Sequence, residues 1–357
     1  APATLGLLAP MSATANEVTI NDFNAAEEIA VTNSRVDGLE ARINNFEAGG
    51  FTDTTSASFS AEAILGGVSS DLPTSEAVSL DYQYGIGLTS SFTGEDSFDV
   101  TIDVGNASGS PSSAVFGMDQ TDDVMTVDGI TYTFPVGGAT MLVGDSTDIS
   151  SLYTGACAYS AFTDYMGDCG TGNSLGVGGN GVTASLGYAF DSGFSLAGGV
   201  SSPNTSVLTT EGGDSIGVEA AYTADTYGIA LAYVDSDGGT GDGTTYWGLN
   251  ASYTPESSFF SSISAGVEME TVDNSGDDAE GYFLGLTWDE VGPGSVSVGA
   301  ATKGNFGDGA NELMIYEAAY SYPVNDAITV TPGIFVEETG PGVDDKTGVI
   351  VKSSFSF

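Results

Sequence analysis

Carboxylates are the most abundant chemically active side chains of this chain. Its 357 residues include 49 Asp and Glu but only 5 Lys and Arg, with no His and 2 Cys, so the formal net charge is -44. Without histidine there is no Ser-His or Cys-His pair for catalysis and no imidazole metal ligand. Carboxylate-only hydrolysis stays open, but no pair stands out among the 49 acids. We therefore expect no enzyme. Because so acidic a chain offers no basic face to nucleic acid, we also expect no nucleic-acid partner.

The two cysteines are Cys157 and Cys169, which lie in a stretch rich in Gly, Ser and Asp. In an exported protein an even pair of cysteines suggests a disulfide that closes a short loop. The alternative is two free thiols, which an oxidising compartment disfavours. We therefore predict a bond between Cys157 and Cys169.

A second group of candidate ligands lies in the sequence DSDGGTGDG. Asp235, Asp237 and Asp242 surround glycines there and resemble a calcium-binding loop. The stretch lacks the bidentate Glu that closes an EF-hand loop. Calcium at these acidic residues is one interpretation, and an ordinary acidic hairpin tip without a cofactor is the other.

Residues 1–15 are apolar but too short for a membrane-spanning helix, which needs about 20 residues. They end in Ala13-Thr14-Ala15, an A-x-A motif typical of signal-peptide cleavage. We expect residues 1–15 to be a signal-peptide remnant. The alternative is an apolar extension of the mature chain.

Residues 16–50 carry a helical heptad pattern. Apolar side chains repeat at heptad positions a and d, and we expect these to join copies of the chain: Ile29, Val36, Leu39, Ile43 and Phe46. Arg35 and Arg42 then fall at g positions, with Glu40 and Glu47 at the following e positions, where charges pair between neighbouring helices. The pattern predicts a short coiled coil, with a lone amphipathic helix as the alternative.

From Thr55 onward the hydrophobic period changes from helical to two. Apolar residues at alternate positions mark the first example: Val78, Leu80, Tyr82, Tyr84, Ile86 and Leu88. A soluble sandwich also alternates, but here aromatic residues end the strands and short turns alternate with longer polar loops. The chain also ends in SSFSF. These features predict an all-β fold over residues 51–357: a transmembrane antiparallel β-barrel of about 16 strands. Residues 106–128 could hold one further hairpin.

The same alternation sorts the charged residues of the strands. Positions expected on the inner wall are Asp81, Asp99, Asp103, Glu219, Glu268 and Glu317, with Lys352 as the basic residue that can be placed there. For each acid by itself, a solvated wall residue is the plainer interpretation. Together they predict a negative potential inside the barrel, which favours cations over anions.

Three segments resemble the porins of marine cyanobacteria, relatives of the carbohydrate-selective OprB-type porins. They are LEARINNFEAGGFTDTTSASFSAEAILGG, TYTFPVGGATMLVGDSTDISSLYTGACAYSAFTDYMGDCGTGN and YPVNDAITVTPGIFVEE. The resemblance implies a homotrimer of 16-stranded channels in outer-membrane lipid, open to small hydrophilic solutes and ions, with the helix of residues 16–50 in the periplasm. Many members carry an S-layer-homology domain before the coiled coil, and none is evident here. The sequence shows no evident row of aromatic residues on the inward face that could contact a sugar. We therefore do not extend the carbohydrate selectivity of that family to this chain.

Residues 146–180 form the longest loop and the third on the long-loop side. In general porins this loop folds into the barrel and narrows it, so the acids expected at the constriction are Asp145, Asp148, Asp164 and Asp168. The predicted disulfide would restrict the loop's conformations and stabilise it against solute flow. A loop that lies outside as a lid is the alternative. For the whole protein, the alternative to a porin is a plugged, non-conducting barrel that acts as an envelope scaffold or recognition target.

The heptad pattern generates a first prediction. Replacing Leu39 and Ile43 with Asp should put charge into the helix seam, because both side chains fall at seam positions. The oligomer should then dissociate on a native gel, while the circular dichroism of the barrel stays unchanged. Asp at the solvent-side position Ala48 serves as the control. An oligomer that survives both seam changes would show that residues 16–50 do not join the subunits.

Overall fold

We describe the protein from a computed structural model. The chain divides into two units, Ala1–Asp53 and Thr54–Phe357, and every described residue belongs to the second. The described ranges are 55–69, 78–110, 113–177, 181–207, 209, 212–239, 241–256, 258–273, 278–307 and 309–356. The signal-peptide remnant and the heptad segment predicted for residues 1–50 lie outside these ranges.

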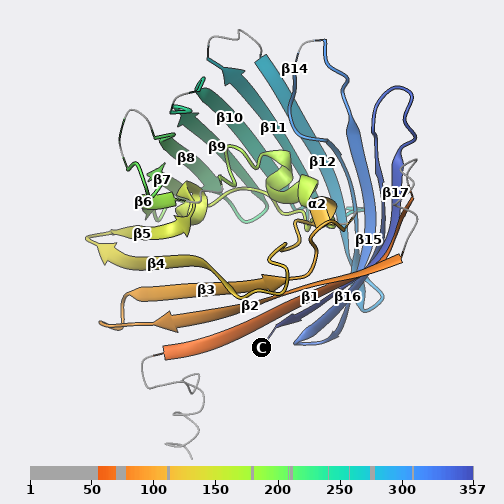
Figure 1. Cartoon of the computed structure of the whole chain (residues 1–357), viewed down its shortest axis with the longest axis horizontal. Coiled ribbons are helices and arrows are strands. Elements are labelled where there is room, and N and C mark those ends of the chain that lie inside the picture. The colour runs from red at the N-terminus through yellow and green to blue at the C-terminus, as the bar shows by residue number, and fades with distance from the viewer. Residues whose placement is uncertain are drawn as a thin grey trace, which may run out of the picture. The chain divides into compact units, whose positions relative to one another are not determined.

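The described part of the chain forms a closed antiparallel barrel of sixteen long strands (Figure 1). The sheet has 17 strands, and one of them, β14 (Phe306–Gly307), is a two-residue strand beside β12, which leaves 17 − 1 = 16. The long strands are β1 (Thr55–Ser69), β2 (Val78–Ser90), β3 (Ser97–Gly105), β4 (Thr126–Val136), β5 (Ala139–Thr147), β6 (Gly181–Ala189), β7 (Phe194–Ser202), β8 (Ser215–Thr223), β9 (Tyr227–Ser236), β10 (Thr244–Tyr253), β11 (Ser262–Val272), β12 (Asp278–Val291), β13 (Gly294–Thr302), β15 (Met314–Asn325), β16 (Ile328–Glu337) and β17 (Lys346–Ser356).

Closure comes from the first strand, which pairs on both of its edges. Ala61 of β1 lies opposite Tyr84 of β2 and opposite Phe355 of β17. Because β1 pairs with both β2 and β17, the sheet has no free edge strand. The predicted antiparallel barrel of about 16 strands is therefore confirmed.

The apolar side chains of the sheet are distributed in the opposite way to those of a soluble sandwich. On β9, Leu231 is 47% exposed, whereas its neighbours Ala230 and Ala232 are 0% and 1% exposed. Large apolar side chains thus face outward, and small or polar ones face the interior. A soluble sandwich would bury Leu231, so this exposure excludes the sandwich interpretation.

Aromatic rings gather at the ends of the strands that short turns connect. Ring pairs there include Phe194 with Tyr222, whose centroids lie 4.7 Å apart, and Phe259 with Trp288, 5.9 Å apart. The turns beside them are short, as at residues 292–293 between β12 and β13. This arrangement matches the ring of aromatic residues expected at one rim of the barrel.

Two long connections at the opposite rim fold into the interior (Figure 1). Loop L2, residues 106–125, joins β3 to β4 and contains the helical turn α2 (Ser113–Phe116). Loop L3, residues 148–180, joins β5 to β6 and contains the 3-10 helices η2 (Ile149–Leu152) and η3 (Asp164–Gly170). The described part of L2 contains no strand, so the optional extra hairpin is absent from it.

The main hydrophobic cluster lies between these loops and the inner wall. It joins Phe116 of L2 and Met166 of L3 with inward-facing wall residues such as Ile64, Phe335 and Ile350. Each of the three wall side chains is at most 1% exposed. Among the described residues, no helix is long and apolar enough to cross a membrane.

Candidate functional site: the loops inside the barrel

Loop L3 crosses the interior and returns along the wall, and a disulfide joins its two halves. Cys157 in the outgoing half and Cys169 in the returning half are bonded, with an S–S distance of 2.01 Å. Cys169 is fully buried against the wall. The predicted disulfide is confirmed, and it closes residues 157–169 of L3 into a covalent loop.

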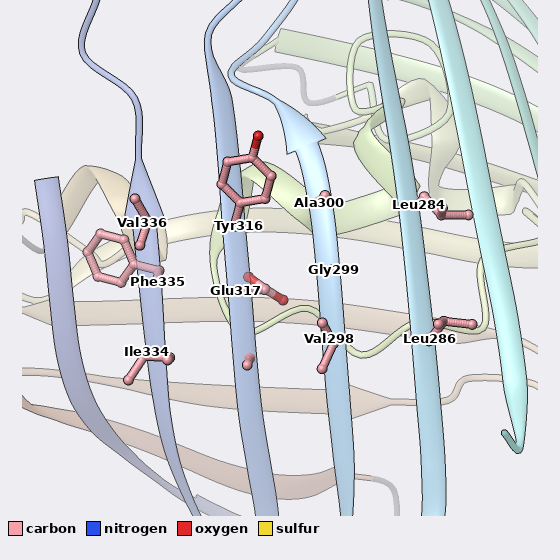
Figure 2. Close-up of a pocket in the computed structure, with 11 residues that line it drawn as sticks. Leu284, Leu286, Val298, Gly299, Ala300, Tyr316, Glu317, Ile334, Phe335 and Val336 are labelled. Carbon is pink, nitrogen blue, oxygen red and sulfur yellow. The ribbon is translucent and has the colours of Figure 1, made fainter. Parts of the chain in front are cut away.

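Glu317 of β15 anchors the outgoing half of L3. Its carboxylate is 3% exposed and accepts hydrogen bonds from Phe162 N at 2.8 Å and Thr163 N at 2.8 Å. Thr163 Oγ1 donates a third bond at 2.6 Å and the Tyr159 hydroxyl a fourth at 2.9 Å. Four donors from one segment of L3 therefore converge on a single wall carboxylate. Figure 2 shows Glu317 on its strand beside Gly299 of β13.

Glu219 of β8 does the same where L3 enters the barrel. It is 3% exposed and accepts hydrogen bonds from Thr154 N at 2.7 Å and Gly155 N at 3.1 Å. Next along the loop, Asn250 of β10 accepts a bond from Ala156 N at 2.9 Å. Backbone N–H groups that have no partner in a sheet are thus satisfied by inward-facing wall side chains.

Glu268 of β11 anchors the returning half of L3. It is fully buried and accepts hydrogen bonds from Asn173 Nδ2 and Ser174 Oγ, both at 2.7 Å. Asn305, beyond the end of β13, donates a further bond at 3.0 Å. The oxygens of these three carboxylates, which the sequence analysis assigned to a pore wall, therefore contact L3 and not open space.

A series of inward-facing glycines makes room for L3 on the wall. The strands β8 to β13 and β16 each present one: Gly217, Gly228, Gly248, Gly266, Gly285, Gly299 and Gly333. A β-carbon at Gly266 would collide with the carbonyl oxygen of Cys169, and one at Gly248 with Ser174 Oγ. Glycine at inward positions of successive strands is a sequence signal for this loop path that alternation alone did not reveal.

Three of the four acids expected at the constriction lie close together in L3. Asp148 and Asp168 line one polar cavity of about 370 Å³. Burial raises the pKa of Asp168, and the nearby carboxylates of Asp148 and Asp164 raise it further. Asp145 is not part of this group, because it pairs with Ile130 on the outward-facing side of β4 and β5.

The remaining wall residues fall into different surroundings. Asp81 of β2 is 4% exposed and accepts a hydrogen bond from Ser110 Oγ of L2 at 2.5 Å. Asp99 of β3 is half-buried and accepts bonds from Thr89 Oγ1 at 2.6 Å and Ser97 Oγ at 2.5 Å. Asp81 thus contacts a loop, whereas the hydrogen bonds of Asp99 within the described ranges come from side chains of neighbouring strand residues.

Asp103 lines a second polar cavity, of about 360 Å³, together with Glu62 and Asp119. Lys352, the basic residue predicted on the inner wall, lies with its Nζ 3.8 Å from Glu62 Oε2. One ammonium therefore faces one of three carboxylates around this cavity.

Sequence reasoning missed the fully buried Glu337 at the end of β16. It forms ion pairs with Lys303 and with Lys346, whose Nζ lies 3.1 Å from Glu337 Oε1. Because Glu337 and Lys346 are direct partners across β16 and β17, the pair could have been found by counting residues on either side of the hairpin. All three lysines in the described barrel thus form ion pairs with glutamates.

The acids considered for calcium lie at the β9–β10 hairpin. Asp235 accepts a bond from the Tyr233 hydroxyl at 3.1 Å, and Asp237 accepts one from Gly239 N at 2.9 Å. Nowhere in the described ranges do three or more potential ligands form a group that could hold a metal. Calcium binding by Asp235, Asp237 and Asp242 stays a prediction.

An apolar hollow of about 420 Å³ lies on the outer face of the barrel, over β12, β13, β15 and β16 (Figure 2). Its lining includes Leu284 and Ile334, which are 53% and 52% exposed. It faces the surroundings of the barrel and not its interior. We therefore take the acidic cavities beside L2 and L3 as the candidate site.

Comparison with known proteins shows what this fold resembles. No family model matches the chain, and no curated protein matches it significantly. The high-pH structure of Pseudomonas putida OprB superposes with a TM-score of 0.67 and 13% identity over 90% of this chain and 97% of that one. A mutant of the Rh. blastica porin gives 0.56 and 15% over 85% and 100%. At these identities the likeness establishes the fold alone, a barrel like those of the two porins.

Anchoring by Glu317 generates a second prediction. In Glu317→Ala, several buried donors of L3 lose their acceptor, at a cost of about 1–3 kcal/mol for each donor left unpaired. The loop should detach from the wall, and single-channel recordings should show a noisier current with a larger mean conductance. Glu312→Ala, an exposed glutamate at the rim, is the matched control. A quiet channel of unchanged conductance would show that Glu317 does not position L3.

Proposed function

We propose that the protein is an outer-membrane porin through which small hydrophilic solutes and ions diffuse passively, with a preference for cations. The observation that carries this proposal is a closed barrel with an apolar outer face whose interior is narrowed, and lined with carboxylates, by an anchored loop. An apolar exterior suits lipid. Acidic groups around a narrow aqueous path attract cations and repel anions.

The distribution of charge supports the cation preference. On one side of the interior, L3 contributes Asp148, Asp164 and Asp168. On the other, the wall contributes Asp99 and Asp103, while each lysine of the described barrel is paired with a glutamate. Carboxylates therefore face carboxylates, and little unpaired positive charge is available to hold anions.

We also propose that three copies assemble, with the heptad segment of residues 16–50 in the periplasm. The heptad pattern in the sequence supports this, as does the resemblance to cyanobacterial porins. The resemblance further favours a location in a cyanobacterial outer membrane, with lipid around the barrel.

One observation favours the second candidate, a plugged barrel used as a scaffold or recognition target. Two loops and a hydrophobic cluster occupy part of the interior. Reconstitution in a planar bilayer separates the two functions, because an open porin gives large stepwise currents and a plugged barrel gives none.

The proposed selectivity generates a third prediction. Under a KCl gradient, the reversal potential should have the sign of cation preference. The double change Asp164→Asn and Asp168→Asn should lower the K⁺/Cl⁻ permeability ratio roughly twofold to fivefold, since unit charges about 4 Å apart in water interact by about 1 kcal/mol. The same change at the loop tip, Asp344→Asn and Asp345→Asn, is the control and should have a smaller effect. Anion preference in the unmodified channel would overturn the electrostatic argument.

The pKa of Asp168 generates a fourth prediction. Because burial and two neighbouring carboxylates raise it above the ordinary value of 3.8, this group should become neutral before exposed aspartates do as the pH falls. Cation preference should therefore start to decline at a pH above the ordinary aspartate range, when measured from about pH 7 to about pH 4. Asp168→Asn should remove this early part of the decline. A decline confined to the ordinary range in both proteins would contradict the prediction.

A further inference from the structure

Three consecutive residues of L3 have a left-handed backbone. Their φ angles are +49° at Asp168, +56° at Cys169 and +68° at Gly170. Glycine adopts this conformation readily, but in other residues the β-carbon then crowds the backbone, so left-handed residues usually occur singly. We call residues 168–170 the left-handed turn. So unfavourable a conformation persists only where its surroundings enforce it, and such places are often functional.

The left-handed turn places two neighbouring side chains in different surroundings. Cys169 is fully buried in the main hydrophobic cluster, and its carbonyl oxygen lies where Gly266 of β11 leaves room. The side chain of Asp168 is instead open to solvent and lines the polar cavity of about 370 Å³ with Asp148. Gly176 also leaves room for this carboxylate, because a β-carbon there would collide with Asp168 Oδ2. The turn therefore determines where the carboxylate of Asp168 lies.

Hydrogen bonds to the left-handed turn converge on one carbonyl group. Asp168 O accepts from Thr171 N at 3.3 Å, from Thr171 Oγ1, and from Asn250 Nδ2 of β10 at 3.4 Å. These bonds fix the peptide group that joins Asp168 to Cys169. The side chain of Cys169 is fixed separately, by its bond to Cys157. The disulfide therefore acts on a residue type that, unlike glycine and aspartate, has no particular tolerance for positive φ.

The wall holds L3 on both sides of the covalent ring that the disulfide closes, residues 157–169. Glu219 accepts two hydrogen bonds from L3 before the ring, and Glu268 accepts two after it. Within the ring, Glu317 accepts four. These attachments should keep L3 inside the barrel even when the two sulfurs are not bonded. The effect of the disulfide should therefore be local, at the left-handed turn.

We propose that the Cys157–Cys169 disulfide positions Asp168 for cation selectivity by holding residues 168–170 in the left-handed conformation. This inference rests on the proposed porin function. Without the bond, Cys169 is free to leave the left-handed region, and the peptide groups on either side of it rotate. The carboxylate of Asp168 then moves away from Asp148, whereas L3 as a whole stays on the wall. Cys157 and Cys169 are positioning residues, because they act on a permeating cation only through Asp168.

The first arm of the test measures selectivity and conductance together. The full-length protein is reconstituted in planar bilayers under a KCl gradient, and Cys157→Ser is compared with Ala158→Ser, a change at the exposed neighbouring residue. Cys157→Ser should lower the K⁺/Cl⁻ permeability ratio about twofold, the effect of one displaced charge on a nearby cation in screened water. Its unit conductance should stay close to that of the unmodified channel, and Ala158→Ser should change neither quantity.

Two results of this arm would overturn the proposal. An unchanged permeability ratio in Cys157→Ser would show that the left-handed turn keeps its shape without the bond. A large rise in the unit conductance of Cys157→Ser would show that the bond fastens the whole loop and not the turn alone.

The second arm asks whether the effect passes through Asp168. Asp168→Asn removes the charge and preserves the shape of the side chain. If the disulfide acts by positioning this carboxylate, the two changes are not additive. Cys157→Ser should then lower the permeability ratio no further in the Asp168→Asn background. An equal further decrease in that background would show that the disulfide acts elsewhere, which contradicts the assignment.

The third arm tests the left-handed conformation itself with two double variants, Cys157→Ser with Cys169→Gly and Cys157→Ser with Cys169→Ala. Both lack the bond and the buried sulfur. Glycine adopts a φ near +56° without crowding, so the first variant should recover cation selectivity and the second should not. Equal permeability ratios in the two would overturn the role of the turn. Absence of current in the unmodified protein would instead defeat the porin function itself, so the two failures are distinguishable.

Discussion

Hydrogen bonding between buried wall carboxylates and the donors of L3 is the interaction on which the interior depends. A loop inside a closed barrel has no sheet edge to pair with, and a buried donor left unpaired costs about 1–3 kcal/mol. Glu317 meets this need by accepting hydrogen bonds from four donors of one loop segment. An ionised carboxylate can do so because it only accepts, whereas an amide would turn donors of its own toward them.

This constraint divides the inward-facing acids into two groups that look alike in the sequence. Alternation assigned Glu317 and Asp99 alike to the inner face, since the side-chain period of a strand is two. It could not tell that a loop covers Glu317 and leaves Asp99 among strand side chains. That difference depends on the path of L3, which contacts far apart in the chain determine. The inward glycines, such as Gly266, are the local trace of that path.

The barrel itself was largely predictable, for physical reasons. Strands with an apolar outer face and a polar inner face must alternate, turns on one side are short, and a disulfide needs two cysteines. Strand positions and the Cys157–Cys169 bond therefore followed from the sequence. The loop was expected at residues 146–180, and in the structure it runs from residue 148 to residue 180, between the end of β5 at Thr147 and the start of β6 at Gly181. L2 escaped prediction because Phe116 and its apolar neighbours have no helical or strand period. They are buried by tertiary contacts alone.

The loops also decide how far the charges of this acidic chain can act. At about 0.1 M salt the Debye length is about 10 Å, and it falls to about 3 Å at 1 M, so carboxylates on a wide wall are largely screened from passing ions. The ion pairs of Glu337 with Lys303 and Lys346 also partly neutralise the positive charge of these two lysines. Acidic residues control an ion only where opposing surfaces approach within the screening length. In the proposed channel, L3 brings Asp148, Asp164 and Asp168 into the interior, so the anchoring of L3 by Glu317 gives these carboxylates their influence.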